Sequence, residues 1–122
     1  MPITQIILVG HCGFDTANLT RFIKKHTDLP IHAAQSPKEL TPYLSPDALL
    51  LINRVIPRAF KLPTGIELIA QLNQQPNPPR SLLISNFPES QQQAITAGAL
   101  PGFGKSHLTD QKSIKLLTDA LQ

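Results

Sequence analysis

The chain contains four short apolar runs. They cover residues 6–9, 30–34, 48–52 and 82–84, and three of them are continuous rather than alternating. Continuous apolar runs are typical of strands that are covered on both faces, as in a parallel sheet. A weaker fifth strand is expected near residues 102–105. The pattern therefore predicts a buried parallel sheet of five strands.

Segments with helical periodicity lie between the apolar runs. Leu19, Phe22 and Ile23 form an apolar stripe at spacing i, i+3, i+4. Ser36 and Thr64 each begin a capping box with Glu three residues later. The expected helix caps, in chain order, are Asp15 or Thr16, Ser36, Thr64 and Asp110.

Two of the predicted helices have distinctive features. Pro42 should make the helix that follows Ser36 short or kinked. Residues 89–97 predict a polar helix with Ala94, Ile95 and Ala97 facing inward. Strict alternation of strands and helices then predicts a doubly wound α/β fold with helices on both faces of the sheet. The whole chain, residues 1–122, is expected to form one domain.

Composition excludes several classes of protein. Apolar residues make up 41% of the 122, enough for a core, and the net charge is only +3. The basic residues are scattered, which disfavours nucleic-acid binding. The N-terminus has neither a basic leader nor a long apolar run, so no membrane association is expected. A single cysteine, Cys12, excludes an internal disulfide and favours the cytoplasm.

Polar residues follow the predicted strands, where open α/β sheets place their ligand sites. They are His11 and Cys12, Asn53, Ser85 with Asn86, and Lys105. This set contains one cation, amides, hydroxyls and a thiol, but no carboxylate. Mg²⁺ prefers carboxylate ligands, and Asp15, the nearest acid, is interpreted as a helix cap. We therefore expect no metal and no cofactor, and His11 with Cys12 lacks the further ligands that zinc needs.

Several segments resemble the receiver domains of bacterial response regulators. Residues 46–51 are similar to the stretch that leads to the phosphoacceptor in that family, and Pro57 to the proline that follows it. Residues 64–69 resemble the start of the third helix, and residues 98–106 the segment that ends in the conserved-type lysine. The resemblance implies the flavodoxin-like strand order 2-1-3-4-5 and a role in two-component or phosphorelay signalling.

The departures from the receiver pattern fall on its phosphorylation site. Gly10, His11 and Cys12 stand where the resemblance implies an acidic pair. The phosphoacceptor position falls on Asn53 when counted back from Pro57, and on Ile52 when counted forward from Asp47. Neither residue is an acid.

Other parts of that site are retained. Ser85 matches the switch hydroxyl and Lys105 the phosphate-pairing lysine, which would be left without its carboxylate. The position of the switch aromatic falls on Gly102, with Phe103 one place later. The sequence therefore predicts an atypical receiver that is not phosphorylated and is not an enzyme.

The polar residues at the strand ends also have other interpretations. Ser85 and Asn53 are expected to satisfy nearby backbone groups. Lys105 can bind an anion, a carboxylate of a partner, or loop carbonyls. An alternative function is a phosphocarrier or phosphatase-like enzyme that uses Cys12, with Gly13 and Thr16 lining a phosphate cradle.

A non-phosphorylated receiver would act through protein contacts. The resemblance implies a face formed by the fourth helix, the fifth strand and the fifth helix. This face would bind another protein or a second copy of the chain, and any effector is expected to be a separate chain. On this chain the face would contain Gln92, Gln93, Thr96, Phe103, His107, Lys112 and Lys115.

Overall fold

The computed structural model describes residues 2–122 and contains a five-stranded sheet in the order β2-β1-β3-β4-β5. All four neighbouring strand pairs are parallel. The predicted fold class and strand order are confirmed. The fifth strand begins two residues earlier than expected. The strands are β1 (Gln5–Val9), β2 (Ile31–Ala34), β3 (Ala48–Asn53), β4 (Arg80–Ile84) and β5 (Leu100–Phe103).

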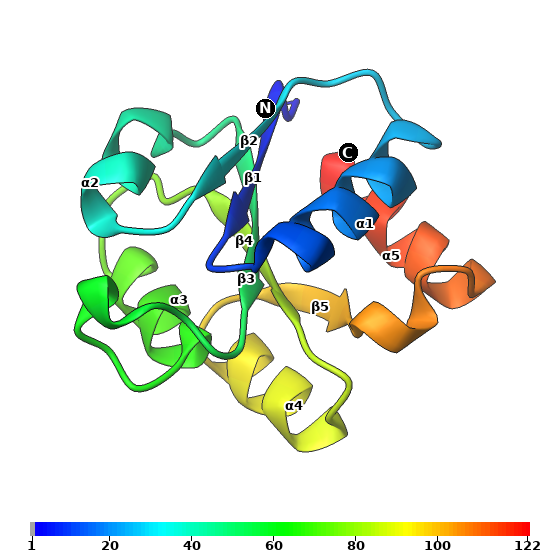
Figure 1. Ribbon diagram of the computed structural model, residues 1–122. Helices are drawn as coiled ribbons and strands as arrows, with labels where there is room; N and C mark the ends of the chain where they lie inside the picture. The colour runs from blue at the N-terminus through cyan, green and yellow to red at the C-terminus, as the bar shows by residue number, and fades with distance from the viewer. Residues whose placement is uncertain (1) are drawn as a thin grey trace.

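Helices cover both faces of the sheet, with α1 and α5 on one side and α2, α3 and α4 on the other (Figure 1). Within residues 2–122, no helix combines the length and apolar character that crossing a bilayer requires. The helices are α1 (Gly13–Lys24), α2 (Pro37–Leu40), α3 (Gly65–Leu72), α4 (Pro88–Thr96) and α5 (Gln111–Leu121), with short 3-10 turns η1 (Thr41–Tyr43), η2 (Arg58–Phe60) and η3 (Lys105–His107).

The core is divided into two layers by the sheet. Successive side chains of a strand point to opposite faces. Ile7 and Leu50 accordingly pack against α2, α3 and α4. Ile6 and Leu8 pack against α1 and α5. Both layers are fully apolar at the central strands, which is why these strands appear in the sequence as unbroken hydrophobic runs.

Most of the predicted helix starts are confirmed. Ser36 Oγ accepts the backbone N–H of Glu39, and Thr64 Oγ1 accepts that of Ile66. The second helix is short, as Pro42 predicts, and passes into the 3-10 turn η1.

Two expectations about the helices are wrong, and a third, the cap at Asp110, is confirmed in its position but not in its side-chain hydrogen bond. The first helix begins at Gly13 with Cys12 as its N-cap, so Asp15 and Thr16 lie inside its first turn. Asp110 is the N-cap of α5, but its carboxylate pairs with His107 instead of a helix N–H. Ile95 does not face inward, because its side chain is 39% exposed.

Candidate functional site

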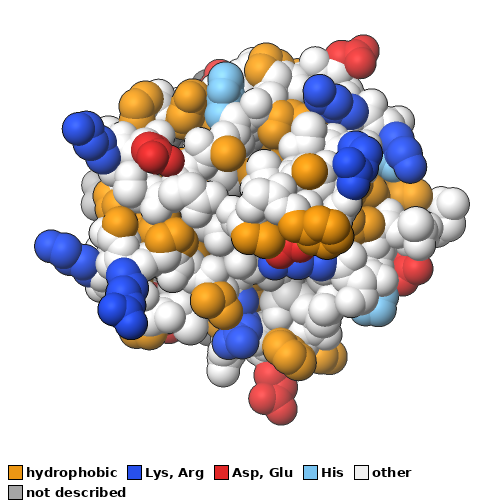
Figure 2. Space-filling model, viewed as in Figure 1, with side chains coloured by type: hydrophobic (Ala, Val, Ile, Leu, Met, Phe, Trp, Pro, Cys, Tyr) orange, Lys and Arg blue, Asp and Glu red, His pale blue; other side chains and the backbone are white. Residues whose placement is uncertain are grey.

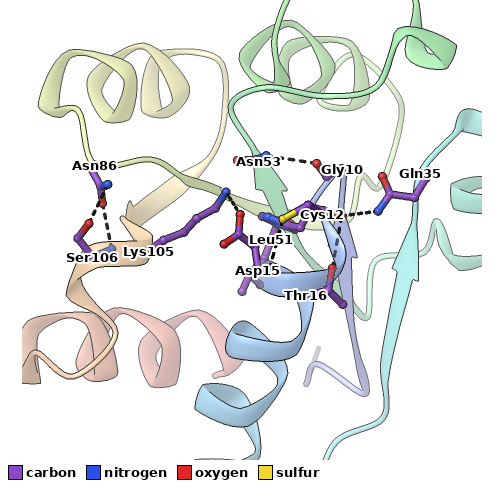
Figure 3. Close-up of polar contacts among 11 residues, drawn as sticks. Gly10, Cys12, Asp15, Thr16, Gln35, Leu51, Asn53, Asn86, Lys105 and Ser106 are labelled. Carbon is purple, nitrogen blue, oxygen red and sulfur yellow. Dashed lines mark hydrogen bonds and ion pairs between the residues drawn. The ribbon is translucent and has the colours of Figure 1, made fainter.

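The carboxyl ends of β1, β3, β4 and β5 meet at one edge of the sheet, as strand order requires (Figure 3). The turn after β1 depends on Gly10, which has φ +79°. A Cβ atom at this position would lie 2.9 Å from Ile56 Cγ2. Because glycine adopts this conformation without strain, the chain can turn tightly and place residues 11 and 12 beside the end of β3.

His11 is a buried structural residue and not an open ligand. Its Nε2 lies 2.9 Å from the carbonyl oxygen of Leu51. A carbonyl only accepts hydrogen bonds, so Nε2 carries the proton and Nδ1 carries the lone pair. Nδ1 has no hydrogen-bond partner among the described residues. Burial lowers the pKa of His11 to about 4, so the imidazole is neutral at physiological pH.

Cys12 caps the first helix and remains exposed. Its Sγ accepts the backbone N–H of Asp15 at 3.5 Å. The hydroxyl of Thr16 donates to the carbonyl of His11 at 3.4 Å. Gly13 and Thr16 thus belong to the first turn of α1.

The central contact of the site is an ion pair between Lys105 and Asp15. Lys105 Nζ lies 2.6 Å from Asp15 Oδ2, and the two side chains are 32% and 23% exposed. The hydrogen bond from Lys105 is the main reason that the pKa of Asp15 lies below its ordinary value. The prediction of a lysine without a carboxylate, in a site without acids, is therefore wrong (Figure 3).

Asn53 and Ser85 satisfy backbone groups, as the sequence predicted. Asn53 Nδ2 donates to the carbonyl of Gly10 at 3.2 Å, which ties β3 to the turn after β1. Ser85 Oγ accepts the backbone N–H of Phe87 at 3.2 Å. Of the two candidates for the acceptor position, Ile52 is fully buried, while Asn53 is the residue at the exposed edge.

Lys105 is positioned by a contact that the sequence did not reveal. A Cβ atom on Gly104 would lie 1.7 Å from Asn86 Oδ1, so the chain before Lys105 runs directly against the loop after β4. Asn86 also donates to Ser106 Oγ at 3.0 Å and accepts the Ser106 N–H at 3.2 Å. The Gly-x-Gly spacing before the lysine was the available signal of this close approach.

The donor set at this edge does not fit Mg²⁺. Asp15 supplies a carboxylate, and it is already held by an ammonium group. The strand ends contribute an imidazole, a thiol and an amide in place of the hard oxygen ligands that the ion prefers. Among the described residues, no three His, Cys, Asp or Glu side chains come together as a metal site.

A groove of about 490 Å³ lies between α4, β5 and α5, on the predicted interaction face. Gln92 and Lys112 are exposed along its rim. Phe103 lies at its floor but is only 5% exposed, and its ring packs edge-on against Phe22. Its assignment to the exposed face is wrong, because its side chain belongs to the core. The remaining predicted face residues, Gln93, Thr96, His107 and Lys115, are exposed.

Comparison with known proteins identifies the fold of the chain but shows no closer relationship. Neither a protein-family model nor a curated protein sequence matches the chain. A DNA-binding response regulator of the LuxR family from Staphylococcus aureus superposes with a TM-score of 0.75 at 14% identity, over 98% of this chain and 100% of that one. A response regulator receiver protein from Pseudoalteromonas atlantica superposes with a TM-score of 0.68 at 22% identity, over 95% and 98%.

A third neighbour was solved as a complex. It is the receiver domain of a downstream response regulator of Saccharomyces cerevisiae, crystallised with a histidine phosphotransfer signalling protein. Its TM-score is 0.64 at 17% identity, over 99% of this chain and 93% of that one. The chain therefore has the receiver, flavodoxin-like fold of response regulators.

Proposed function

We propose that this chain is a receiver-type signalling domain that is not phosphorylated and acts through protein contacts. The observation that carries the proposal is the ion pair between Lys105 and Asp15. It occupies the lysine with a carboxylate of the chain itself, at the edge where a receiver would present its phosphoacceptor. The receiver fold of the structural neighbours supports the signalling role.

The chemistry of Asn53 supports the same proposal. Its amide is not a nucleophile toward a phosphoryl donor, as a carboxylate is. A phosphoryl group switches a domain by adding charge that a hydroxyl and a cation then capture. Here Lys105 is already paired with Asp15, while Ser85 Oγ accepts a backbone N–H and keeps its own proton to donate. The cation that would capture a phosphoryl group is therefore occupied. The domain is thereby held in one state.

The pair is also connected to the groove that we assign to a protein partner or a second copy. Lys105 lies two residues after the end of β5, which forms the floor of this groove. Gln91 of α4 ties this helix to β4 and β5, because its side chain donates to the carbonyl oxygen of Leu83 and accepts the backbone N–H of Gly102. A fixed Lys105 therefore implies a groove of fixed shape. The exposed thiol of Cys12 supports a reducing compartment such as the cytoplasm.

Binding of beryllofluoride, a phosphoryl mimic, tests the proposal in solution. Backbone amide spectra recorded with and without the mimic and Mg²⁺ should be identical over residues 100–107. A saturable shift of the Lys105 and Gly104 amides would refute it. A conventional receiver measured in parallel shows that the mimic is active.

The exposure of Cys12 at the N-terminus of α1 supports a second candidate, a thiol-based phosphocarrier or phosphatase-like enzyme. The negative charge of Asp15 in the same turn opposes phosphate binding. The discriminating measurement is the rate of iodoacetamide modification at neutral pH. A rate equal to that of free cysteine would exclude an activated nucleophile, and a much faster one would favour the enzyme.

A further inference from the structure

The outer side of β2 carries backbone groups that no neighbouring strand pairs. β2 stands first in the sheet order, so β1 is its one neighbour among the described strands. The carbonyls of Pro30 and Ala34 accept backbone N–H groups from β1 and from the residue after it. Hydrogen bonding toward one neighbour alternates along a strand, so the N–H and C=O groups of Ile31 and Ala33 point away from β1. Among the hydrogen bonds described for residues 2–122, none reaches these outward groups.

The outer side of β2 is also accessible. A hollow of about 370 Å³ runs along it, lined by residues 28–33 and by Thr20 and Lys24 of α1. Ala33 is exposed, so α1 does not close over the strand. On the opposite face of the sheet, the His32 ring stacks on that of Tyr43, with 4.5 Å between the ring centroids. The strand is thus flanked by a hollow on one face and by a flat aromatic pair on the other.

The other outer strand, β5, is protected against pairing. Pro101 lacks an N–H, the N–H of Gly102 is taken by the side chain of Gln91, and the pairing with β4 shifts register. Prolines, bulges and charged residues are the usual means by which proteins prevent pairing at the edge of a sheet. Residues 31–34 read Ile-His-Ala-Ala and contain no proline, lysine, arginine or acid. β2 therefore lacks these protections and is open to a further strand.

We propose that two copies of this chain pair through their β2 strands, antiparallel about a two-fold axis at His32, and so form one continuous sheet. In this register Ile31 of each copy lies opposite Ala33 of the other. Every outward N–H and C=O group then has a partner, because residues opposite one another in a hydrogen-bonded pair exchange both bonds. A shift of the axis by one residue would leave some of these groups unpaired.

The side chains of β2 are compatible with a second copy. Ile31 and Ala33 face the same side of the sheet as α1, so the large side chain of one copy meets the small one of the other. No charged side chain of residues 31–34 opposes its own copy. On the face of the molecule in Figure 2, basic and acidic side chains are interspersed rather than gathered by sign. An extended segment of another protein would form the same backbone bonds, but this self-complementarity favours a second copy.

This contact is separate from the groove of α4, β5 and α5, since β2 and β5 are at opposite edges of the sheet. The proposed function therefore stands if the β2 contact fails. The strand has 4 residues, so few hydrogen bonds join the two copies, and we expect a reversible dimer.

Sedimentation velocity over a wide range of protein concentration, up to the millimolar range, tests the proposal. The wild-type chain should pass from monomer to dimer as its concentration rises. Ala33→Pro removes an outward N–H and Ala33→Lys adds a charge, so both variants should remain monomeric. Ala59→Lys is the matched control, because Ala59 is exposed outside β2, and it should dimerise like the wild type. Melting temperatures show that the variants are folded, and Ala33→Lys at an exposed position serves where Ala33→Pro is not.

Three results of this experiment would overturn the proposal. One is a wild-type chain that stays monomeric at every concentration. Another is a dimer that persists in Ala33→Lys and dissociates in Lys112→Glu, which would assign self-association to the groove. The third is a monomeric chain that binds an extended peptide selected from a display library and loses it in Ala33→Lys, which would assign β2 to another protein.

Cysteine cross-linking tests the register in a Cys12→Ser background. His32→Cys should give a disulfide-linked dimer, because opposed residues at the axis have Cα atoms about 4.5 Å apart, within disulfide range. Ala33→Cys is the matched control, since its two copies would lie about 8 Å apart, beyond the limit of about 7 Å. Equal cross-linking of the two variants on a non-reducing gel, or cross-linking of neither, would contradict the pairing at His32.

Discussion

Substitution of Asp15 by Asn removes one charge of the central ion pair and keeps the size of the side chain. The pair is short, at 2.6 Å, and its side chains are 32% and 23% exposed. Fully exposed pairs contribute about 0–1 kcal/mol, whereas breaking a buried pair costs about 3–5 kcal/mol. This pair lies between the two cases and closer to the exposed one, because solvent screens it. We expect Asp15→Asn to lower the free energy of unfolding by about 1–2 kcal/mol.

Urea unfolding followed by circular dichroism measures this loss. Asp119→Asn is the matched control, since it breaks the pair with Lys115, whose side chains are 74% and 50% exposed. We expect the control to lose no more than about 0.5 kcal/mol. A loss in Asp15→Asn no larger than in Asp119→Asn would refute the claim that the Lys105 contact holds the site together.

The pH dependence gives the same prediction a second test. The pKa of Asp15 is lowered in the folded state, so the stabilisation is complete above the unfolded value near 3.8. It is lost as the pH falls through the lower folded-state value. The difference between wild type and Asp15→Asn should therefore be constant from pH 7 to 5 and shrink below about pH 4. A difference that persists unchanged at low pH would point to packing instead of charge.

Three further predictions follow from the neighbouring residues. The pKa of His11 is about 4 in the folded state and near 6.5 in the unfolded state, so the unfolded chain binds a proton at higher pH than the folded one. The free energy of unfolding should therefore fall by about 3 kcal/mol from pH 7 to pH 4. In urea unfolding, His11→Gln should reduce this dependence on pH. Asn53→Asp should cost about 1–3 kcal/mol in the same assay, because the donor to Gly10 O is lost; an unchanged stability would contradict this role. Phe103→Ala should lower the free energy of unfolding by about 3–5 kcal/mol and lower the melting temperature, while Gln92→Ala should leave the melting temperature unchanged. Equal effects of the two substitutions would contradict the assignment of Phe103 to the core.

The sheet could be predicted because its central strands are buried on both faces. The runs at residues 6–9 and 48–52 are apolar at every position for that reason. The caps Ser36 and Thr64 were predictable because they depend on residues two or three positions away. The edge strand β5 was less predictable. Its pairing with β4 shifts register between Leu82 and Ile84, so its alternation is broken. Phe103 was assigned to the exposed face from the receiver resemblance alone, and that assignment is wrong.

The candidate site was predictable in its positions but not in its contacts. Strand ends meet at one edge, so His11, Asn53, Ser85 and Lys105 could be grouped from the strand pattern alone. The Asp15 contact could not, because 90 residues separate it from Lys105 and the capping chemistry of an aspartate gave a sufficient local explanation. The available signal was the start of α1. Once Cys12 is the cap, Asp15 is the third residue of the helix and faces the edge of the sheet where Lys105 follows β5.

The claim that the chain is a receiver-type domain without phosphorylation is tested most directly by incubation with acetyl phosphate and Mg²⁺, followed by intact-protein mass spectrometry. A conventional receiver serves as the positive control, and the sample is kept at neutral pH and analysed rapidly because acyl phosphates hydrolyse. We predict that the mass of this chain is unchanged when the control is fully modified. A Mg²⁺-dependent phosphoryl adduct on the chain would contradict the account.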